Sequence, residues 1–336
     1  MQIIRLTQNH RDFYNLNKIS FIQNQEPIFD EIRKKNLCLT IGNFDGVHLG
    51  HQAIISRLIE ISQQKNLASA IMTFEPHPLA FFNENKKIDF RISTLKQKIK
   101  ILQKFKIDYL ILQNFNNNFA QLSADFFIKN ILENTLSIKH LLVGYDFTFG
   151  KNRQGNFKDL ERANFFLEEI NPIKIEIGNQ HLTCSSSLVR SLLKSGDIKN
   201  ANKVLGKNFA IEGQVIHGQK LARKLGFPTL NLICKAQQIK PKFGVYKSFV
   251  KINNSDKKLL SITNFGIKPT ITDNESQPLF ETHIINFNHD LYGEKVIIEI
   301  EDFIREEKKF SSVEDLKNQI NLDIVSLNNP LNKGFK

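Results

Sequence analysis

An apolar run that ends in a glycine-rich turn constrains this chain more than any other stretch. Residues 39–41 are typical of the end of a strand, and residues 52–65 carry apolar side chains at helical spacing. A strand, a glycine turn and a helix N-terminus together favour the binding of an anion, because backbone N–H groups and the positive end of the helix dipole point the same way. The pattern predicts a phosphate-binding turn whose histidines donate hydrogen bonds to phosphoryl oxygens, although a helix start with two partly exposed histidines has the same local pattern. The glycines and histidines of this turn are Gly42, Gly46, Gly50, His48 and His51.

The length and charge of the chain limit the classes of protein it can be. A chain of 336 residues suits two domains of ordinary size. The formal net charge is +12, but the lysines are scattered among acidic residues and form no long basic block. We therefore expect no nucleic-acid binding, while a basic surface could still attract nucleotide substrates. The sequence leaves the oligomeric state open.

The cysteines and the apolar runs indicate a compartment. Cys38, Cys184 and Cys234 are odd in number, widely separated and without metal-type spacing. This pattern argues for a reducing compartment and against a disulfide framework or a zinc site. The first 25 residues contain no signal-peptide core, and no apolar run is long enough to span a membrane. We expect a cytoplasmic protein that does not contact a membrane.

The first part of the chain alternates between strand-like and helix-like segments after the glycine turn. Such alternation implies an α/β fold with a doubly wound parallel sheet, which binds ligands at the carboxyl ends of its strands. The expected strands are residues 68–74, 109–112, 140–143 and 173–177, and the expected helices are residues 94–105 (capped by Ser93 or Thr94), 123–134 (capped by Ser123) and 158–169.

The second part of the chain is rich in β-structure. Two short helices at residues 185–193 and 197–205 precede it, and a helix at residues 313–320 is expected to close it. Alternating segments with polar turns between them predict a compact antiparallel barrel or sandwich. The expected domains are therefore residues 1–204 and 205–336. The strand candidates are residues 210–216, 244–252, 260–264, 280–287 and 295–303.

Every loop with candidate chemistry in the first part follows a strand or begins a helix. These loops are the glycine turn, residues 74–78, residues 143–155 and residues 185–190, and we expect them to meet at one rim of the sheet. His48-Leu49-Gly50-His51 matches the His-x-Gly-His signature of the nucleotidyltransferase superfamily. With Asn43-Phe44-Asp45-Gly46 in front, the stretch resembles the adenylyltransferase half of bacterial bifunctional riboflavin kinase/FAD synthetases.

The resemblance implies a Rossmann-like domain in which the phosphate of FMN attacks the α-phosphorus of ATP, giving FAD and pyrophosphate. It implies His48, His51 and Arg190 as catalytic residues and Pro76, His77 and Pro78 as flavin-binding residues. Taken alone, Arg190 could be a surface arginine, Asp146 a turn cap and His77 a structural histidine. The implied ATP-binding residues of this domain are Gly42, Phe44, Asp45, Gly46, His48, His51, Asp146, Arg153, Ser186, Ser187 and Arg190.

In the second part, Thr229 and Asn231 offer two oxygen ligands on one face of an extended segment. That geometry could hold a hydrated Mg²⁺, although an ordinary strand edge has the same pattern. Residues 213–218 and 223–231 resemble the flavokinase signature, so the barrel resembles a riboflavin kinase that uses ATP. The resemblance implies Thr229 and Asn231 as metal ligands, Glu281 as the catalytic base for the 5′-hydroxyl of riboflavin and Arg305 as a flavin-binding residue. The implied ATP-binding residues of the kinase are Gly218, Arg223, Gly226, Pro228, Thr229 and Asn231.

Three positions depart from the flavokinase pattern. Ala222 stands where a glycine is usual, Phe265 replaces a commoner isoleucine and Lys268 a commoner arginine. Three hypotheses follow: an enzyme that converts riboflavin to FMN and then to FAD, an adenylyltransferase whose barrel is only a flavin-binding or regulatory module, and a flavin- or nucleotide-sensing protein without turnover. The first is favoured because all proposed catalytic positions are filled.

Overall fold

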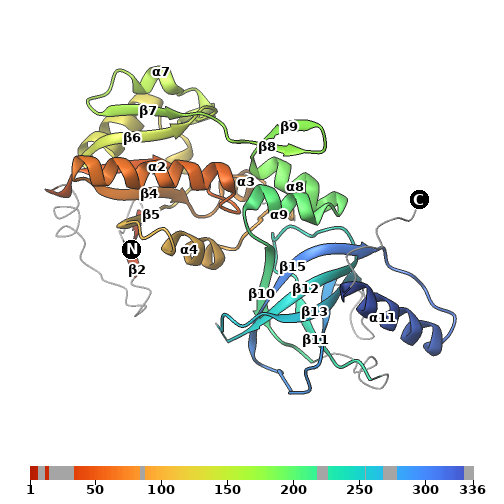
Figure 1. Cartoon of the computed structure of the whole chain (residues 1–336). Helices are drawn as coiled ribbons and strands as arrows, with labels where there is room; N and C mark the ends of the chain where they lie inside the picture. Colours follow the sequence, from red (N-terminus) through yellow and green to blue (C-terminus); the bar gives the residue numbers. More distant parts are fainter. Residues whose placement is uncertain are drawn as a thin grey trace. The chain divides into compact units, whose positions relative to one another are not determined.

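The computed structural model describes residues 1–6, 12–14, 34–83, 88–217, 226–253, 255–267 and 278–328. It contains two compact units (Figure 1). The first comprises Met1–Ile88 and Ser93–Ser185, and the second comprises Asp89–Ile92 and Ser186–Lys336. The short segment 89–92 belongs to the second unit because Arg91 pairs with Gln238 and donates its backbone N–H to Gln237.

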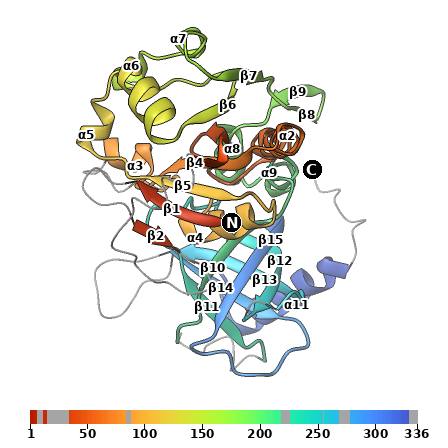
Figure 2. The same cartoon turned by 90° about the vertical axis from the view of Figure 1, so that its left-hand side faces the viewer.

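The first unit is built on a seven-stranded sheet in the order β2-β1-β5-β4-β3-β6-β7. All its strands run parallel except β2, which is antiparallel to β1. Every residue of the central strands β3 and β5 is buried, as parallel strands covered on both faces require. The doubly wound parallel sheet is confirmed (Figure 2). The strands are β1 (Gln2–Leu6), β2 (Asp12–Tyr14), β3 (Leu37–Ile41), β4 (Ala68–Phe74), β5 (Tyr109–Gln113), β6 (Ile138–Gly144) and β7 (Phe166–Ile170).

Helices cover both faces of this sheet. Ile55, Leu58 and Ile61 of α2 and Leu102 of α4 belong to the apolar core on one face. The other core contains Phe127 and Leu132 of η1, with Leu160 of α7. Thr94 caps α4 in a capping box with Gln97, which settles the choice between Ser93 and Thr94. The helices are α2 (Leu49–Lys65), α3 (Pro78–Phe82), α4 (Leu95–Gln103), α5 (Asn117–Ala120), α6 (Ala124–Phe126), the π-helix η1 (Phe127–Thr135), the 3₁₀ turn η2 (Lys151–Arg153) and α7 (Phe157–Leu160).

Two expectations for the first unit are wrong. Residues 158–169 do not form one helix, because α7 ends at Leu160 and β7 follows as the strand that pairs with β6. Residues 173–177 do not join the sheet, since β8 (Lys174–Ile177) pairs only with β9 (Gln180–Thr183) in a hairpin. Gly178 permits that tight turn, with a φ of 59°.

His140, a buried histidine of β6, makes the stability of the first unit depend on pH. Its Nε2 lies 3.8 Å from Oε2 of Glu168, whose carboxylate accepts two hydrogen bonds from Arg57, of 2.7 and 3.2 Å. Burial lowers the pKa of His140 below its ordinary 6.5; the charge of Glu168 opposes this shift, and Lys65 and Arg57 add to it. The unfolded chain therefore binds more protons than the folded one. The free energy of unfolding is therefore highest above the pKa that His140 has in the unfolded chain, and it falls as the pH drops through that value.

We expect His140→Phe to weaken this loss of stability at acid pH. A phenyl ring can keep the stacking on Phe166, whose ring centroid lies 5.9 Å away, but it cannot take up a proton. The free energy of unfolding of the first unit can be measured with urea at each pH. Between about pH 7 and pH 5, it should fall more steeply in the wild type than in the variant, by up to about 1.4 kcal/mol per pH unit. The same pH slope in both proteins would contradict the assignment.

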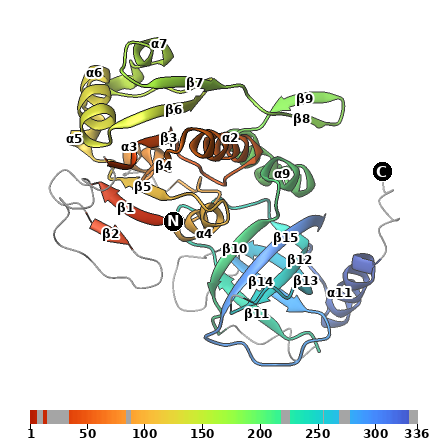
Figure 3. The same ribbon diagram turned by 60° about the vertical axis from the view of Figure 1, so that its left-hand side comes forward.

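The second unit is an antiparallel sheet in the order β10-β15-β12-β13-β14-β11 (Figure 3). Its two edges meet where Ile216, just after β10, pairs with Asn231 of β11. The sheet therefore curls into the predicted barrel, and α11 is the predicted C-terminal helix, longer than expected. The strands are β10 (Phe209–Gln214), β11 (Thr229–Ile233), β12 (Gly244–Ile252), β13 (Leu259–Ile267), β14 (Pro278–Ile284) and β15 (Lys295–Arg305), and the helices are α8 (Ser186–Ser195), α9 (Ile198–Leu205) and α11 (Val313–Asn328).

Candidate active sites

The glycine turn of the first unit has a strained backbone held by buried side chains. β3 ends at Ile41, and α2 begins at Leu49 with His48 as its N-cap. Phe44, Gly46 and Val47 have φ values of 47°, 77° and 44°. A positive φ is costly for a branched residue such as Val47, and it persists because Phe44 and Val47 are 1% and 0% exposed within the core. The turn is therefore pre-formed.

Polar contacts from Ser93, just before the N-cap of α4, and from residues of α4 and β4 hold the same turn. The backbone N–H of Gly46 donates to Oγ of Ser93 at 3.1 Å, and the N–H of Ser93 donates to Oδ1 of Asp45 at 3.2 Å. The carbonyl of Asn43 accepts from Nζ of Lys98 at 2.7 Å and from Oγ1 of Thr73 at 3.1 Å. Lys98 and Thr73 were not singled out in the sequence, and Ser93 was considered only as a helix cap, because no local pattern links these residues to the turn.

The two histidines lie against each other at the start of α2. Their ring centroids are 3.7 Å apart and their planes differ by 25°. The backbone N–H of His51 donates to Nδ1 of His48 over a long 3.4 Å, so a neutral His48 ring carries its proton on Nε2. Gly50 makes room for this arrangement, since a Cβ there would lie 3.2 Å from the His48 ring. The pair can present ring N–H donors beside a helix N-terminus.

Three of the predicted loops follow adjacent parallel strands. β4, β3 and β6 are neighbours, so the segments after their carboxyl ends lie at the same edge of the sheet. His77, after β4, is buried and caps α3 by accepting the N–H of Leu79 at 3.1 Å. Pro76 and Pro78 flank it, with Pro78 in the first turn of α3. The first unit thus gathers the glycine turn and these two prolines at one rim.

The loop after β6 carries the exposed residues Asp146 and Arg153. The guanidinium Nε of Arg153 donates to Oγ1 of Thr148 at 2.8 Å. Both side chains lie at the surface after a strand next to β3, where solvent or a ligand can reach them. Their predicted contacts with the nucleotide stay a prediction.

Ser186, Ser187 and Arg190 lie in α8, which belongs to the second unit. Nε of Arg190 donates to the carbonyl of Phe90 at 2.7 Å, and its guanidinium lies 5.9 Å from the ring centroid of that residue. The predicted phosphate contacts of these three residues stay a prediction.

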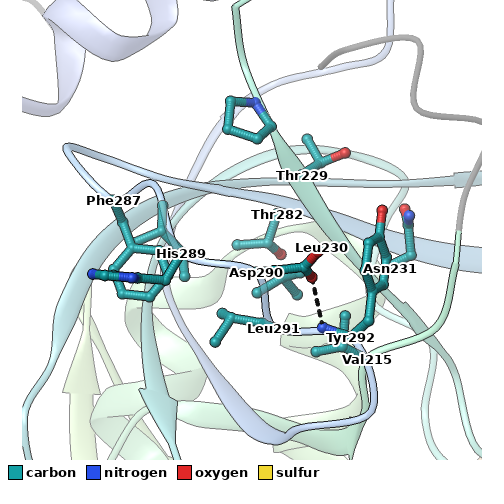
Figure 4. A pocket seen from close by; sticks show the side chains of 12 residues that line it. Val215, Thr229, Leu230, Asn231, Thr282, Phe287, His289, Asp290, Leu291 and Tyr292 are labelled. Atoms are coloured by element: carbon teal, nitrogen blue, oxygen red, sulfur yellow. Dashed lines mark hydrogen bonds between the residues drawn. The ribbon is translucent and has the colours of Figure 1, made fainter.

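The second unit has a cavity beside β11 and β14 (Figure 4). Its volume is about 60 Å³. The antiparallel register sets Thr229 opposite His283 and Asn231 opposite Glu281, so these four side chains share one face of the strand pair. Asn231 is 4% exposed, and its Oδ1 has no hydrogen-bond partner among the described residues. The cavity is lined by Val215, Pro228, Thr229, Leu230, Asn231, Thr282, Ile284, Phe287, His289, Asp290, Leu291 and Tyr292.

The donor set at this cavity fits a hard cation such as Mg²⁺. A buried amide oxygen without a partner needs a ligand or water, and the Thr229 hydroxyl shares the cavity wall with it. The described residues contain no cluster of three or more histidine, cysteine, aspartate or glutamate side chains that could form a closed metal cage. An ion here would need further ligands from phosphate and water, as Mg²⁺ usually does.

The sequence did not reveal two polar side chains of the cavity wall. Asp290 accepts the backbone N–H of Tyr292 at 3.0 Å, and His289 precedes it (Figure 4). This aspartate caps its own turn, and the polar run before Leu291 was the only signal for it. A carboxylate on the cavity wall could interact with a bound cation or its water.

The structure describes only some of the remaining residues predicted for the kinase. Gly218, Ala222, Arg223 and Lys268 lie outside the described residues. Gly226 is exposed and has a φ of 90°, a conformation that favours glycine. Arg305, predicted to bind flavin, forms an ion pair with the buried carboxylate of Asp323 in α11, at 2.7 Å. Its guanidinium thus links β15 to α11, and its flavin contact stays a prediction.

Comparisons with known families divide the chain in the same way as the motifs do. The family model described as FAD synthetase matches residues 30–186, and the one described as riboflavin kinase matches residues 205–331. In the structure, residues 186–204 belong to the second compact unit, and the predicted boundary at 204/205 stays a prediction. Among the described residues, no helix is both long and apolar enough to cross a membrane.

Curated relatives match both halves together. A bifunctional riboflavin kinase/FMN adenylyltransferase of Buchnera aphidicola subsp. Schizaphis graminum is 42% identical over 294 residues, covering 86% of this chain and 92% of the relative. The corresponding protein of Escherichia coli K12 is 36% identical, over 85% of this chain and 90% of the relative. A crystal structure described as a macrolide-efflux protein from Streptococcus pneumoniae is 28% identical, covers 88% of this chain and 94% of that chain, and has a TM-score of 0.78. The chain belongs to the bifunctional riboflavin kinase/FMN adenylyltransferase family.

Proposed function

We propose that this chain makes FAD from riboflavin in two ATP-dependent steps, each in its own unit. The 5′-hydroxyl of riboflavin first takes the γ-phosphoryl group of ATP, giving FMN and ADP. A phosphate oxygen of FMN then bonds to the α-phosphorus of a second ATP, and the bond to pyrophosphate breaks. The observation that supports the proposal is that two sets of polar side chains lie in separate units. One is the stacked histidine pair at the glycine turn, and the other is the set of Thr229, Asn231 and Glu281 on one face of β11 and β14.

In the adenylyltransferase unit, the turn and the histidines stabilise charge. Transfer to phosphorus depends on positioning and on charge stabilisation more than on covalent help. The N-terminus of α2, which follows the turn, attracts the ATP phosphates through the positive end of its dipole. His48, through Nε2–H, and His51 donate to oxygens that gain charge as pyrophosphate leaves. Asp146 and Arg153 contact the nucleotide, and Pro76, His77 and Pro78 shape the flavin site.

In the kinase unit, Glu281 acts as the base. Its carboxylate lies across from Asn231, on the same face of the strand pair, and accepts the proton of the 5′-hydroxyl as that oxygen attacks. Thr229 and Asn231 hold the metal, and Gly218, Arg223, Gly226 and Pro228 contact the ATP phosphates. Bound Mg²⁺ supplies neutralisation of phosphate charge.

Asn231→Ala should raise the Mg²⁺ concentration needed for FMN formation by roughly tenfold or more, because a buried oxygen ligand is lost. FAD formation from supplied FMN should keep its wild-type Mg²⁺ dependence, since that site lies in the other unit. A Mg²⁺ titration of both activities measures this. If FMN formation by the variant keeps the wild-type Mg²⁺ dependence, Asn231 is not a ligand.

We also propose that the protein works in the reducing cytoplasm. Cys38, Cys184 and Cys234 are free and buried. Burial raises the pKa of the Cys38 and Cys234 thiols to about 11, so both stay protonated and poorly nucleophilic at neutral pH. Three inert thiols are compatible with a compartment that keeps cysteine reduced.

The function is tested by incubating the purified protein with riboflavin, ATP and Mg²⁺ and separating the flavins by chromatography. FMN followed by FAD supports the two-step enzyme. FAD only when FMN is supplied would leave an adenylyltransferase with a flavin-binding barrel, and no product would leave a binding protein. A His51→Ala/Glu281→Ala double variant, purified in parallel, controls for contaminating host enzymes.

A further inference from the structure

His283 lies next to the proposed kinase residues, on the same face of β14 as Glu281. The two residues alternate with Thr282, which points to the barrel interior and is fully buried. Across the strand pair, His283 is the direct partner of Thr229, and Glu281 of Asn231. A proposed base, two proposed metal ligands and one histidine therefore occupy a single patch of sheet. The histidine has no role in the two reactions as described above.

The ring of His283 holds the peptide that precedes Thr229. Its Nδ1 lies 2.9 Å from the carbonyl oxygen of Pro228. A carbonyl oxygen can only accept a hydrogen bond, so Nδ1 carries the proton. The ring of Phe227 packs edge-on against the imidazole, with centroids 5.5 Å apart and planes at 89°. The ring thus has a fixed orientation and a fixed donor.

The bond matters because Pro228 stands at the start of β11. Its carbonyl belongs to the same rigid peptide plane as the backbone nitrogen of Thr229. A proline has no N–H of its own, so the preceding peptide plane, between Phe227 and Pro228, lacks a backbone donor that could secure the approach to the strand. Holding the carbonyl fixes the plane, and with it the direction in which the Thr229 side chain leaves the strand.

The strand that carries His283 is itself anchored inside the barrel. Four buried hydroxyls form a chain across β12, β13 and β14, from Ser261 through Ser248 and Thr263 to Thr282. Their oxygens lie 2.8, 2.7 and 2.8 Å apart, and all four residues are 0% exposed. A buried and fully bonded polar network makes its surroundings rigid. β14 is therefore a firm support from which a donor can hold a neighbouring segment.

From this geometry we infer that His283 is a positioning residue for the kinase reaction, acting through Nδ1–H on Pro228 and so on Thr229. The inference rests on the proposed kinase function and adds to it a residue that touches neither substrate. Only the Nδ1–H group of the ring is needed for this positioning role, and Nε2 is not required.

Two amide substitutions separate the two ring nitrogens. The amide group of asparagine lies close to the position of Nδ1, whereas that of glutamine reaches the position of Nε2. His283→Asn should keep the rate of FMN formation within about twofold, since it restores the donor to Pro228. His283→Gln and His283→Ala should lower kcat/KM roughly ten- to a hundredfold, mainly through a higher KM for Mg·ATP, with the KM for riboflavin unchanged.

Each outcome decides the question. Rescue by asparagine but not by glutamine supports the inference. Equal impairment of the asparagine and glutamine variants, or full activity of His283→Ala, would overturn it. Thermal unfolding identifies any variant that fails to fold, and FAD formation from supplied FMN normalises for active protein. Failure of the wild type to form FMN would count against the proposed function, whereas the ratios between variants test only His283.

Discussion

His51→Ala is expected to lower FAD formation from FMN and ATP by roughly a hundred- to a thousandfold, while FMN formation from riboflavin is unchanged. The histidine supplies a donor to charge that develops as pyrophosphate leaves, and loss of one such donor costs about this much. The proposed kinase residues belong to a different compact unit. The two activities of one purified sample, measured by chromatography of flavins, provide the comparison.

His181→Ala is a matched control for this variant. His181 belongs to the first unit but lies exposed on the β8–β9 hairpin, outside the proposed site. It should leave both activities at the wild-type level. Loss of both activities in His51→Ala would contradict the assignment of separate sites, and full retention of FAD formation would remove His51 from the reaction.

Glu281→Ala is expected to have the opposite effect. FMN formation should fall by roughly a hundred- to ten-thousandfold, because the 5′-hydroxyl loses the group that accepts its proton. FAD formation from supplied FMN should continue at the wild-type rate. The loss should appear in kcat more than in the KM for ATP, since the carboxylate acts on the attacking hydroxyl and not on the nucleotide.

Glu314→Ala serves as the control, because Glu314 is an exposed carboxylate in the first turn of α11 and does not belong to β11 or β14. A Glu281→Gln variant tests whether the charge or only the shape of the side chain is needed. If the glutamine variant forms FMN as fast as the wild type, Glu281 is not the base.

Local sequence patterns were sufficient to predict most elements of the fold. The apolar run of β4 and the capped helix α4 are found where hydrophobic spacing and a threonine cap placed them. The errors occurred where spacing was ambiguous. Residues 158–169 have apolar side chains at intervals that also suit a helix, yet β7 pairs beside β6, and that pairing depends on contacts distant in sequence. Strand β1 was missed for the same reason, because its place beside β5 joins residues more than a hundred positions apart.

The candidate sites show the same limit. The glycine turn and the Thr229–Asn231 face could be predicted, because each is a pattern within a few residues. The residues that hold these two segments in place could not be predicted. Ser93, Lys98 and Thr73 reach the turn from other elements, and the bond from His283 to Pro228 spans 55 positions in the chain. Periodicity gives the direction of a side chain on its own element but not the partner that it meets.

The central claim is that one chain carries out both transfers, and the fate of the ATP phosphates tests it most directly. The wild-type protein is incubated with riboflavin and ATP radiolabelled at either the γ- or the α-phosphorus, and the FAD is isolated and cleaved into FMN and AMP. We predict that γ-labelled ATP marks the FMN half alone and that α-labelled ATP marks the AMP half alone. FAD without label from γ-labelled ATP, or no FAD from riboflavin at all, would contradict a two-step synthesis by this chain.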